Sequence, residues 1–222
     1  MNSRYEHAAR VFARTLRNGN TVGLGSSPHM SFIVKAIRQR MIEEDLYLEV
    51  VPSTMDVAHL LAEYKIPMGK MRGKDLDVSL EFADRADKYL NYVKTGTNSL
   101  LRDKTLVLDS RKNVVILTHP PLREKLNGLT PFEVNRFAVA NTIRALSSFG
   151  STYIRVNAHK QNITTEDSNY LVNVDISEEF DMEDVDEVAR KIPGVLETGI
   201  FMHLADEVIL LEKDLEVISA RA

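Results

Sequence analysis

The sequence predicts an α/β fold, namely a doubly wound, mostly parallel sheet with a smaller ferredoxin-like α+β insert. Short apolar segments alternate with amphipathic helical patterns up to about residue 118, which is typical of a parallel sheet covered by helices. After Pro131 the order changes to two strands between two helices, flanked by further strands, which favours a ferredoxin-like unit. With 44% hydrophobic residues, the 222-residue chain is able to bury large cores.

The first part of the chain begins with a helix and continues in a strand–helix rhythm. Apolar residues recur at helical spacing over residues 4–17, and the Asn-Gly-Asn turn at 18–20 ends this pattern. A short buried strand then leads through a glycine-containing turn into an amphipathic helix. The predicted strands here are 21–25, 46–52, 76–82 and 113–118, and the predicted helices are 4–17, 30–43, 55–65 and 98–104.

The second part carries the predicted insert. Its predicted strands are 132–137, 151–157, 170–176 and 195–201, and its predicted helices are 139–149 and 182–192. The tail at 206–220 alternates like a strand and is expected to return to the first sheet. Because the turn-forming cluster at 127–131 separates two apolar segments, we expect one domain at 1–128 plus 205–222 and the insert at 129–204.

Composition excludes several classes of function. The balance of 28 basic and 32 acidic residues lacks the positive excess of a nucleic-acid-binding protein. No apolar run reaches the length of a membrane span and the N-terminal region is charged, so a cytoplasmic protein without membrane contact is expected. The chain has no cysteine, and its six histidines show no pair at ligand spacing. We therefore expect neither a metal site nor a cofactor.

The turn VGLGSSPHM at 22–30 is one candidate binding site. A glycine-rich strand-to-helix turn presents backbone N–H groups to an anion, usually a phosphate. Gly25 permits close approach of the backbone, and Ser26 and Ser27 add hydroxyl donors. Pro28 has no N–H, and His29 either donates to a phosphate or caps the helix. Both a phosphate site and a plain tight turn fit this pattern.

The run at 79–104 is the second candidate site. It places Glu81, Asp84, Lys94 and Asp103 close together in the chain, which fits either a catalytic constellation or a solvated, charged loop. Glu81 falls at the carboxyl end of a predicted strand, where open α/β sheets bind ligands. Lys94 precedes a flexible, hydroxyl-bearing turn at 95–97. A lysine near several carboxylates suits proton transfer next to a carbonyl.

At these residues the chain resembles the ribose-5-phosphate isomerase family of type A. The segments EFADR (81–85), LNYVKTGT (90–97) and SLLRDK (99–104) resemble its D-G-A-D-E, L-N-L-I-K-G-G-G and A-L-L-R-E-K motifs without a gap. The turn at 22–30 resembles its V-G-L-G-T-G-S-T-A segment, and PGVLETGIF (193–201) its P-G-V-V-E-T-G-L-F segment. The resemblance covers nearly the whole chain.

The resemblance implies a metal-free interconversion of ribose 5-phosphate and ribulose 5-phosphate through an enediol, in the pentose phosphate pathway. It places Asp103 in the role of the base and gives Glu81, Asp84 and Lys94 the task of holding and polarising the sugar oxygens. It also implies a homodimer or homotetramer. The residues expected to bind substrate are Gly25, Ser26, Ser27, His29, Thr95, Gly96 and Thr97.

Several residues depart from the family pattern at the site itself. Asp103 is one methylene shorter than the expected glutamate, and Glu81 is one methylene longer than the expected aspartate. Phe82 replaces a glycine, and THPP at 118–121 stands where the family has D-E-S-K. These changes predict altered activity or an altered substrate. Three readings stay open: a divergent ribose-5-phosphate isomerase, an isomerase of another sugar phosphate, and a non-catalytic sugar-phosphate-binding or structural homologue.

Overall fold

The computed structural model describes residues 2–71, 73, 76–211 and 216–219. The chain forms two compact units: Met1–Ala83, Arg102–Pro121 and Leu204–Ala222 make the first, and Asp84–Leu101 and Leu122–His203 make the second. Residues 84–101 and 122–128 thus belong to the second unit, whereas the sequence-based division gave them to the larger domain. This division shows which segments pack together, but it does not test which segments fold as separate domains. The predicted domain boundary therefore stays a prediction.

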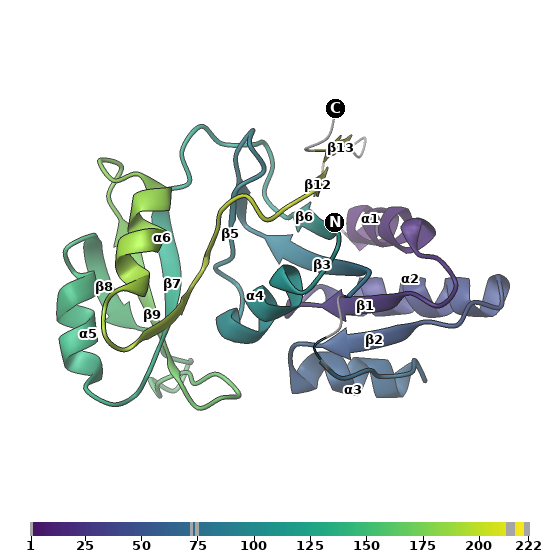
Figure 1. Cartoon of the computed structure of the whole chain (residues 1–222), viewed down its shortest axis with the longest axis horizontal. Coiled ribbons are helices and arrows are strands. Elements are labelled where there is room, and N and C mark those ends of the chain that lie inside the picture. The colour runs from purple at the N-terminus through teal and green to yellow at the C-terminus, as the bar shows by residue number, and fades with distance from the viewer. Residues whose placement is uncertain (1, 72, 74–75, 212–215, 220–222) are drawn as a thin grey trace. The chain divides into compact units, whose positions relative to one another are not determined.

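The first unit is built on a six-stranded sheet (Figure 1). All neighbouring strands are parallel except the last pair, β12 and β13. This arrangement confirms the predicted mostly parallel α/β sheet and the return of the tail to it. The strand order is β13 (Glu216–Ser219), β12 (Glu207–Leu210), β6 (Asn113–Leu117), β3 (Val78–Ala83), β1 (Thr21–Leu24) and β2 (Glu49–Pro52).

Helices cover both faces of this sheet. Val50 packs in the large core with residues of α1 (Asn2–Thr15), α2 (Met30–Glu43) and α3 (Met55–Glu63). Val51 instead packs with Leu76 and with Leu106 of α4 (Leu100–Leu108). Neighbouring residues of a strand point to opposite faces, so α4 covers the face opposite the large core. The predicted doubly wound arrangement is confirmed.

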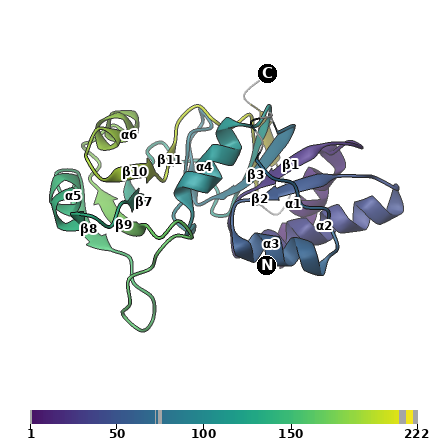
Figure 2. The same cartoon turned by 60° about the horizontal axis from the view of Figure 1, so that its bottom comes forward.

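The second unit contains the predicted insert. Its sheet has the order β10-β7-β9-β8, with every neighbouring pair antiparallel. In chain order these are the fourth, first, third and second strands of this sheet, and α5 and α6 lie on one face of it (Figure 2). This is the ferredoxin-like topology that the sequence predicts. The elements are β7 (Gly128–Val134), α5 (Val139–Leu146), β8 (Gly150–Ile154), β9 (Tyr170–Ile176), α6 (Met182–Arg190) and β10 (Val195–Thr198).

A small antiparallel sheet in the second unit has no counterpart in the sequence-based prediction. It consists of β4 (Arg85–Ala86), β5 (Tyr92–Val93) and β11 (Ile200–Phe201) in the order β11-β5-β4. Tyr92 and Phe201 stack across it with ring centroids 4.5 Å apart, and both are fully buried. The predicted strand at 195–201 is therefore two strands, and the segment before Lys94 is ordered rather than a solvated loop.

Replacing Gly194 by alanine is expected to lower the melting temperature. Gly194 has φ +99°, and an added Cβ would lie 2.4 Å from Oγ1 of Thr142, so backbone strain and overpacking each cost about 1–3 kcal/mol. Gly19→Ala is the matched control, because Gly19 has φ +85° but nothing within 4 Å of an added Cβ. Thermal unfolding that shows equal shifts for both variants would contradict the packing part of this prediction.

Candidate active site

The candidate site of the first unit lies where the strand order reverses. From β1 the chain passes to β2 on one side, and from β2 it returns to β3 on the other side of β1. Open α/β sheets bind ligands in the crevice at the carboxyl ends of such a strand pair. Leu24 of β1 is paired with Leu80 of β3, so the turn after β1 begins beside Glu81.

The Glu81 carboxylate packs directly against the backbone of this turn. An added Cβ at Gly25 would lie 2.0 Å from Oε2 of Glu81, a distance that no real Cβ contact reaches. Glu81 is 1% exposed. The side chain at position 81 therefore occupies the space that the missing Cβ leaves, and a larger residue at position 25 would have to displace the Glu81 carboxylate.

The Asp103 carboxylate is bound by the next residue of the same turn. The backbone N–H of Ser26 donates to Oδ1 of Asp103 at 2.9 Å, and the Ser26 hydroxyl donates to Oδ2 at 3.0 Å. Asp103 lies in the first turn of α4 and is fully buried. Two consecutive turn residues, Gly25 and Ser26, thus lie against the two candidate site carboxylates of the first unit. The donors of Ser26 face the chain's own carboxylate, and phosphate binding at this turn stays a prediction.

His29 lies in an aromatic cluster with Tyr5, Phe32 and Phe82. Its ring stacks on Tyr5 with centroids 4.1 Å apart and lies tilted to Phe82 at 5.9 Å. His29 is the N-cap residue of α2, but its side chain makes no capping hydrogen bond. Its backbone N–H donates to Oγ of Ser27 at 3.2 Å. Phe82 lies within β3 and is not a positive-φ residue, so its backbone does not need the glycine of the family pattern.

The second unit places Lys94 at the end of β5, beside the Glu-Thr-Gly segment at 197–199. The Lys94 N–H donates to the Gly199 carbonyl at 3.0 Å. An added Cβ at Gly199 would lie 2.9 Å from the Lys94 carbonyl oxygen and 2.7 Å from Pro131. Lys94 is 2% exposed. The glycine of this segment therefore lets two backbones approach closely and fixes the main chain at Lys94.

Asp84 binds the turn that follows Lys94. Its Oδ2 accepts hydrogen bonds from the backbone N–H groups of Thr95 at 2.6 Å and Gly96 at 3.3 Å. Thr97 is fully buried, and its Oγ1 accepts from the Ser99 N–H at 2.9 Å just before α4. The second unit thus brings Asp84 together with Thr95 and Gly96, as the first unit brings Glu81 and Asp103 together at the turn after β1.

Three buried or partly buried polar residues of this region were missed by sequence reasoning. Arg155 donates to the carbonyl oxygens of Thr95 and Thr97, and Asn173 accepts from Arg155. Glu133 accepts from the backbone N–H of Leu101 at 3.0 Å. Their partners are distant in sequence, so no motif or spacing in the chain could have indicated these roles.

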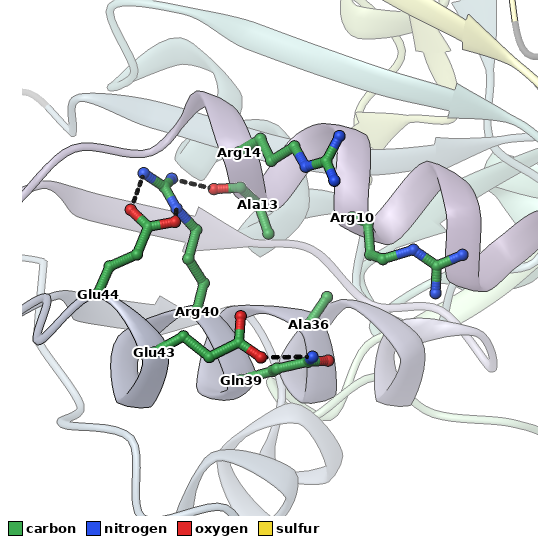
Figure 3. Close-up of a pocket in the computed structure, with 8 residues that line it drawn as sticks. All are labelled: Arg10, Ala13, Arg14, Ala36, Gln39, Arg40, Glu43 and Glu44. Atoms are coloured by element: carbon green, nitrogen blue, oxygen red, sulfur yellow. Dashed lines mark hydrogen bonds and ion pairs between the residues drawn. The ribbon is translucent and has the colours of Figure 1, made fainter.

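A cavity in the first unit lies between α1 and α2, away from the predicted site residues (Figure 3). Arg40 crosses it and binds Glu44 at 2.9 Å and the Leu16 carbonyl at 2.5 Å. The Arg40 guanidinium lowers the pKa of Glu44 through their hydrogen bond. The bond to Leu16 ties α2 to the end of α1, so the cavity is part of a helix–helix contact. The lining residues are Arg10, Ala13, Arg14, Ala36, Gln39, Arg40, Glu43 and Glu44.

Two further observations concern the residues that the structure describes. No three side chains of His, Asp or Glu are grouped there in a way that could hold a metal ion. None of the described helices is both long and apolar enough to cross a membrane.

Comparison with known proteins decides the family. The profile of "Ribose 5-phosphate isomerase A (phosphoriboisomerase A)" matches residues 49–214. The chain belongs to this family. Among curated ribose-5-phosphate isomerase A proteins, that of Desulfatibacillum aliphaticivorans is 29% identical over 214 residues, covering 94% of this chain and 93% of that protein. Ribose-5-phosphate isomerase A 1 of Oceanobacillus iheyensis is 27% identical and covers 91% of each chain.

Solved structures of the isomerase family share this fold. The ribose 5-phosphate isomerase A of Methanocaldococcus jannaschii matches with a TM-score of 0.91 at 24% identity, covering 98% of this chain and 99% of that one. The ribose 5-phosphate isomerase of Plasmodium falciparum matches with a TM-score of 0.93 at 19% identity and covers both chains entirely. The resemblance read from the sequence motifs and the predicted fold class are confirmed.

Proposed function

We propose that the protein is an aldose–ketose isomerase that interconverts ribose 5-phosphate and ribulose 5-phosphate. Membership of the ribose 5-phosphate isomerase A family over residues 49–214 supports this assignment. The observation that carries it at the level of residues is the pair of buried carboxylates, Glu81 of β3 and Asp103 of α4, which both lie against the turn after β1. A crevice at this edge is where such sheets bind ligands.

The proposed reaction moves one proton between neighbouring carbons of the sugar. Asp103 removes the proton from C2 of the open-chain aldose while the carbonyl oxygen O1 takes up a proton, which gives an enediol. Asp103 then returns its proton to C1 while the O2 hydroxyl gives up its proton, so that O2 becomes the ketose carbonyl. A base needs a fixed position within hydrogen-bond reach of the carbon acid, and the two bonds from Ser26 hold the Asp103 carboxylate in one orientation. Glu81, Asp84 and Lys94 are proposed to hold and polarise the sugar oxygens O1 and O2.

The residues proposed to bind the substrate differ in the contacts that they make within the protein. Gly25, Ser26 and Ser27 belong to the turn after β1, and Thr95 and Gly96 belong to the turn held by Asp84. His29 would contact the substrate from a ring position that is set by its stacking on Tyr5. Thr97 would contact the substrate from a fully buried position. Soaking with ribose 5-phosphate, and locating its phosphate relative to Ser27 and His29, tests the assignment of the turn.

A second candidate function is binding of a sugar phosphate without catalysis. The observation that favours it is that Asp103 is fully buried and both of its oxygens accept bonds from Ser26. A continuous assay of the purified protein, with ribose 5-phosphate as substrate and ribulose 5-phosphate as product, separates the two candidates. Turnover supports the isomerase, and saturable binding of ribose 5-phosphate without turnover supports the binding protein.

We also propose a cytoplasmic homodimer or a larger homo-oligomer. The strands β8 and β10 form the two edges of the sheet in the second unit, and exposed edges offer backbone groups for pairing with a second copy. Light scattering is expected to give a mass of at least twice 25.1 kDa. A particle of the mass of one chain at working concentration would contradict this expectation.

A further inference from the structure

The side chain of Arg155 reaches from the end of β8 to the turn that follows Lys94. Its Nη1 donates to the Thr97 carbonyl at 2.7 Å and its Nη2 to the Thr95 carbonyl at 2.8 Å. The same Nη2 donates to Oδ1 of Asn173 at 2.9 Å. Asn173 lies on β9 and is 5% exposed. The planar guanidinium is therefore oriented by a buried amide and binds two carbonyl groups of one turn.

The opposite side of this turn faces Asp84. Oδ2 of Asp84 accepts from the N–H groups of Thr95 and Gly96, while Arg155 binds the Thr95 carbonyl. The Thr95 carbonyl and the Gly96 N–H belong to one peptide group, so this peptide plane is bound at both ends. A positive charge at the carbonyl also polarises the peptide group and strengthens its N–H as a donor. Arg155 thus acts on Asp84 through the backbone of the turn.

Binding the turn removes the Arg155 guanidinium from part of its hydration, which is unfavourable for a charged group. Burial lowers the pKa of Arg155, while the Tyr153 hydroxyl and the Asp84 carboxylate act in the opposite direction. An arginine remains charged under these conditions, and a partly buried guanidinium persists where its hydrogen bonds offset the lost hydration. The bonds that do so are those to the turn and to Asn173.

Glu133 of β7 binds the start of α4 in the same unit. Oε1 of this fully buried residue accepts from Oγ1 of Thr165 and Nδ2 of Asn169, each at 2.9 Å. Its Oε2 accepts from the Leu101 N–H in the first turn of α4 at 3.0 Å, where a negative charge is favourable. Arg155 therefore fixes the start of the segment from Thr95 to Leu101, and Glu133, which is held by Thr165 and Asn169 of the β8–β9 connection, fixes its end.

We propose that Arg155 is a positioning residue of the active site, which fixes the turn at 95–97 so that Asp84 and Lys94 keep the orientation that the reaction needs. The inference rests on the proposed isomerase function. A lysine at position 155 would keep the charge but could not bind two carbonyl groups with a rigid fork. A methionine would keep most of the apolar stem and lose both the charge and the bonds.

The test compares Arg155→Lys and Arg155→Met with the parent in two independent readouts. Amide hydrogen exchange of residues 95–101 is expected to become about tenfold faster in both variants, because bonds from a charged donor are lost. The kcat for ribose 5-phosphate is expected to fall about 10-fold in Arg155→Lys and about 100-fold in Arg155→Met, as misplacement by about 1 Å has effects of this size. KM is expected to change less than kcat, because the turn orients Asp84 and Lys94, which are proposed to polarise the sugar oxygens during the reaction.

Arg136→Lys is the matched control. Arg136 is exposed and lies over the ring of Tyr170 at 5.1 Å. The Arg136→Lys variant is therefore expected to show the same amide exchange at residues 95–101 and the same kcat as the parent. Faster exchange in the Arg155 variants with an unchanged kcat would overturn the positioning role. A parent protein without turnover would instead overturn the proposed function. In that case, weaker binding of ribose 5-phosphate by Arg155→Lys supports positioning at a binding site, and unchanged binding overturns it.

Discussion

Asp103→Asn is expected to lower kcat for ribose 5-phosphate by at least about 100-fold, because it removes the proposed base and keeps its shape. The amide oxygen of asparagine can still accept the bond from the Ser26 N–H, and its NH₂ group can donate to the Ser26 hydroxyl, so both contacts of the carboxylate have a replacement. The fold is therefore expected to persist. Steady-state kinetics and thermal unfolding of the same preparation measure the two effects.

Asp56→Asn is the control for this variant. Asp56 lies in the first turn of α3, as Asp103 lies in the first turn of α4, and both helices have nine residues. Asp56 is exposed, whereas Asp103 is fully buried. Loss of a carboxylate from a helix N-terminus is thus common to both variants, and loss of the base is specific to Asp103→Asn. If Asp103→Asn turned over ribose 5-phosphate like the parent, Asp103 would not be the base.

Shortening Glu81 and lengthening Asp103 are expected to be harmful separately and compatible together. Glu81→Asp withdraws the carboxylate from the space above Gly25, and Asp103→Glu pushes the carboxylate past the two donors of Ser26. Each change displaces a reacting group by about 1 Å, which is expected to lower kcat/KM by up to about 100-fold. Because the two carboxylates rest on consecutive residues of one turn, the double variant is expected to deviate from additivity by about 0.5–3 kcal/mol in activation free energy.

The opposite outcome has a clear signature. If the site had simply lost its chemistry, Asp103→Glu alone would raise activity and Glu81→Asp would add to it independently. A cycle of Glu81→Asp with Asp56→Glu serves as the control, since Asp56 is an exposed residue of α3. Additivity within about 0.3–0.5 kcal/mol is expected for that pair. Equal additivity in the Glu81–Asp103 cycle would contradict the proposed coupling.

The layers of the fold were predictable because their signal is local and periodic. The parallel sheet follows from apolar strands that alternate with amphipathic helices, and the ferredoxin-like unit follows from the order of its elements after Pro131. The sheet of β4, β5 and β11 was not predictable in this way. Its strands have two residues each, which is too short for any periodicity, and β11 pairs with a segment more than a hundred residues earlier in the chain.

The sequence selects the candidate site residues as a set, but it does not determine their contacts. The motifs indicated Glu81, Asp84, Lys94 and Asp103, while the pattern at Ser26 fitted both a phosphate site and a plain tight turn. The structure shows that the donors of Ser26 bind Asp103. Which donor faces which acceptor depends on the path of the backbone after β1, and residue types alone do not determine that path. His29 illustrates the same limit, because its stacking on Tyr5 depends on the packing of α1 against α2.

The central claim is that the protein moves a proton between C1 and C2 of ribose 5-phosphate, and proton NMR in deuterium oxide tests it most directly. An enediol intermediate exposes the transferred proton to solvent, so deuterium is expected at C1 of the ribulose 5-phosphate formed and, on reversal, at C2 of ribose 5-phosphate. Deuterium incorporation at both positions should be absent in Asp103→Asn. If the folded parent protein bound ribose 5-phosphate but produced neither ribulose 5-phosphate nor exchange at C2, the isomerase assignment would be contradicted.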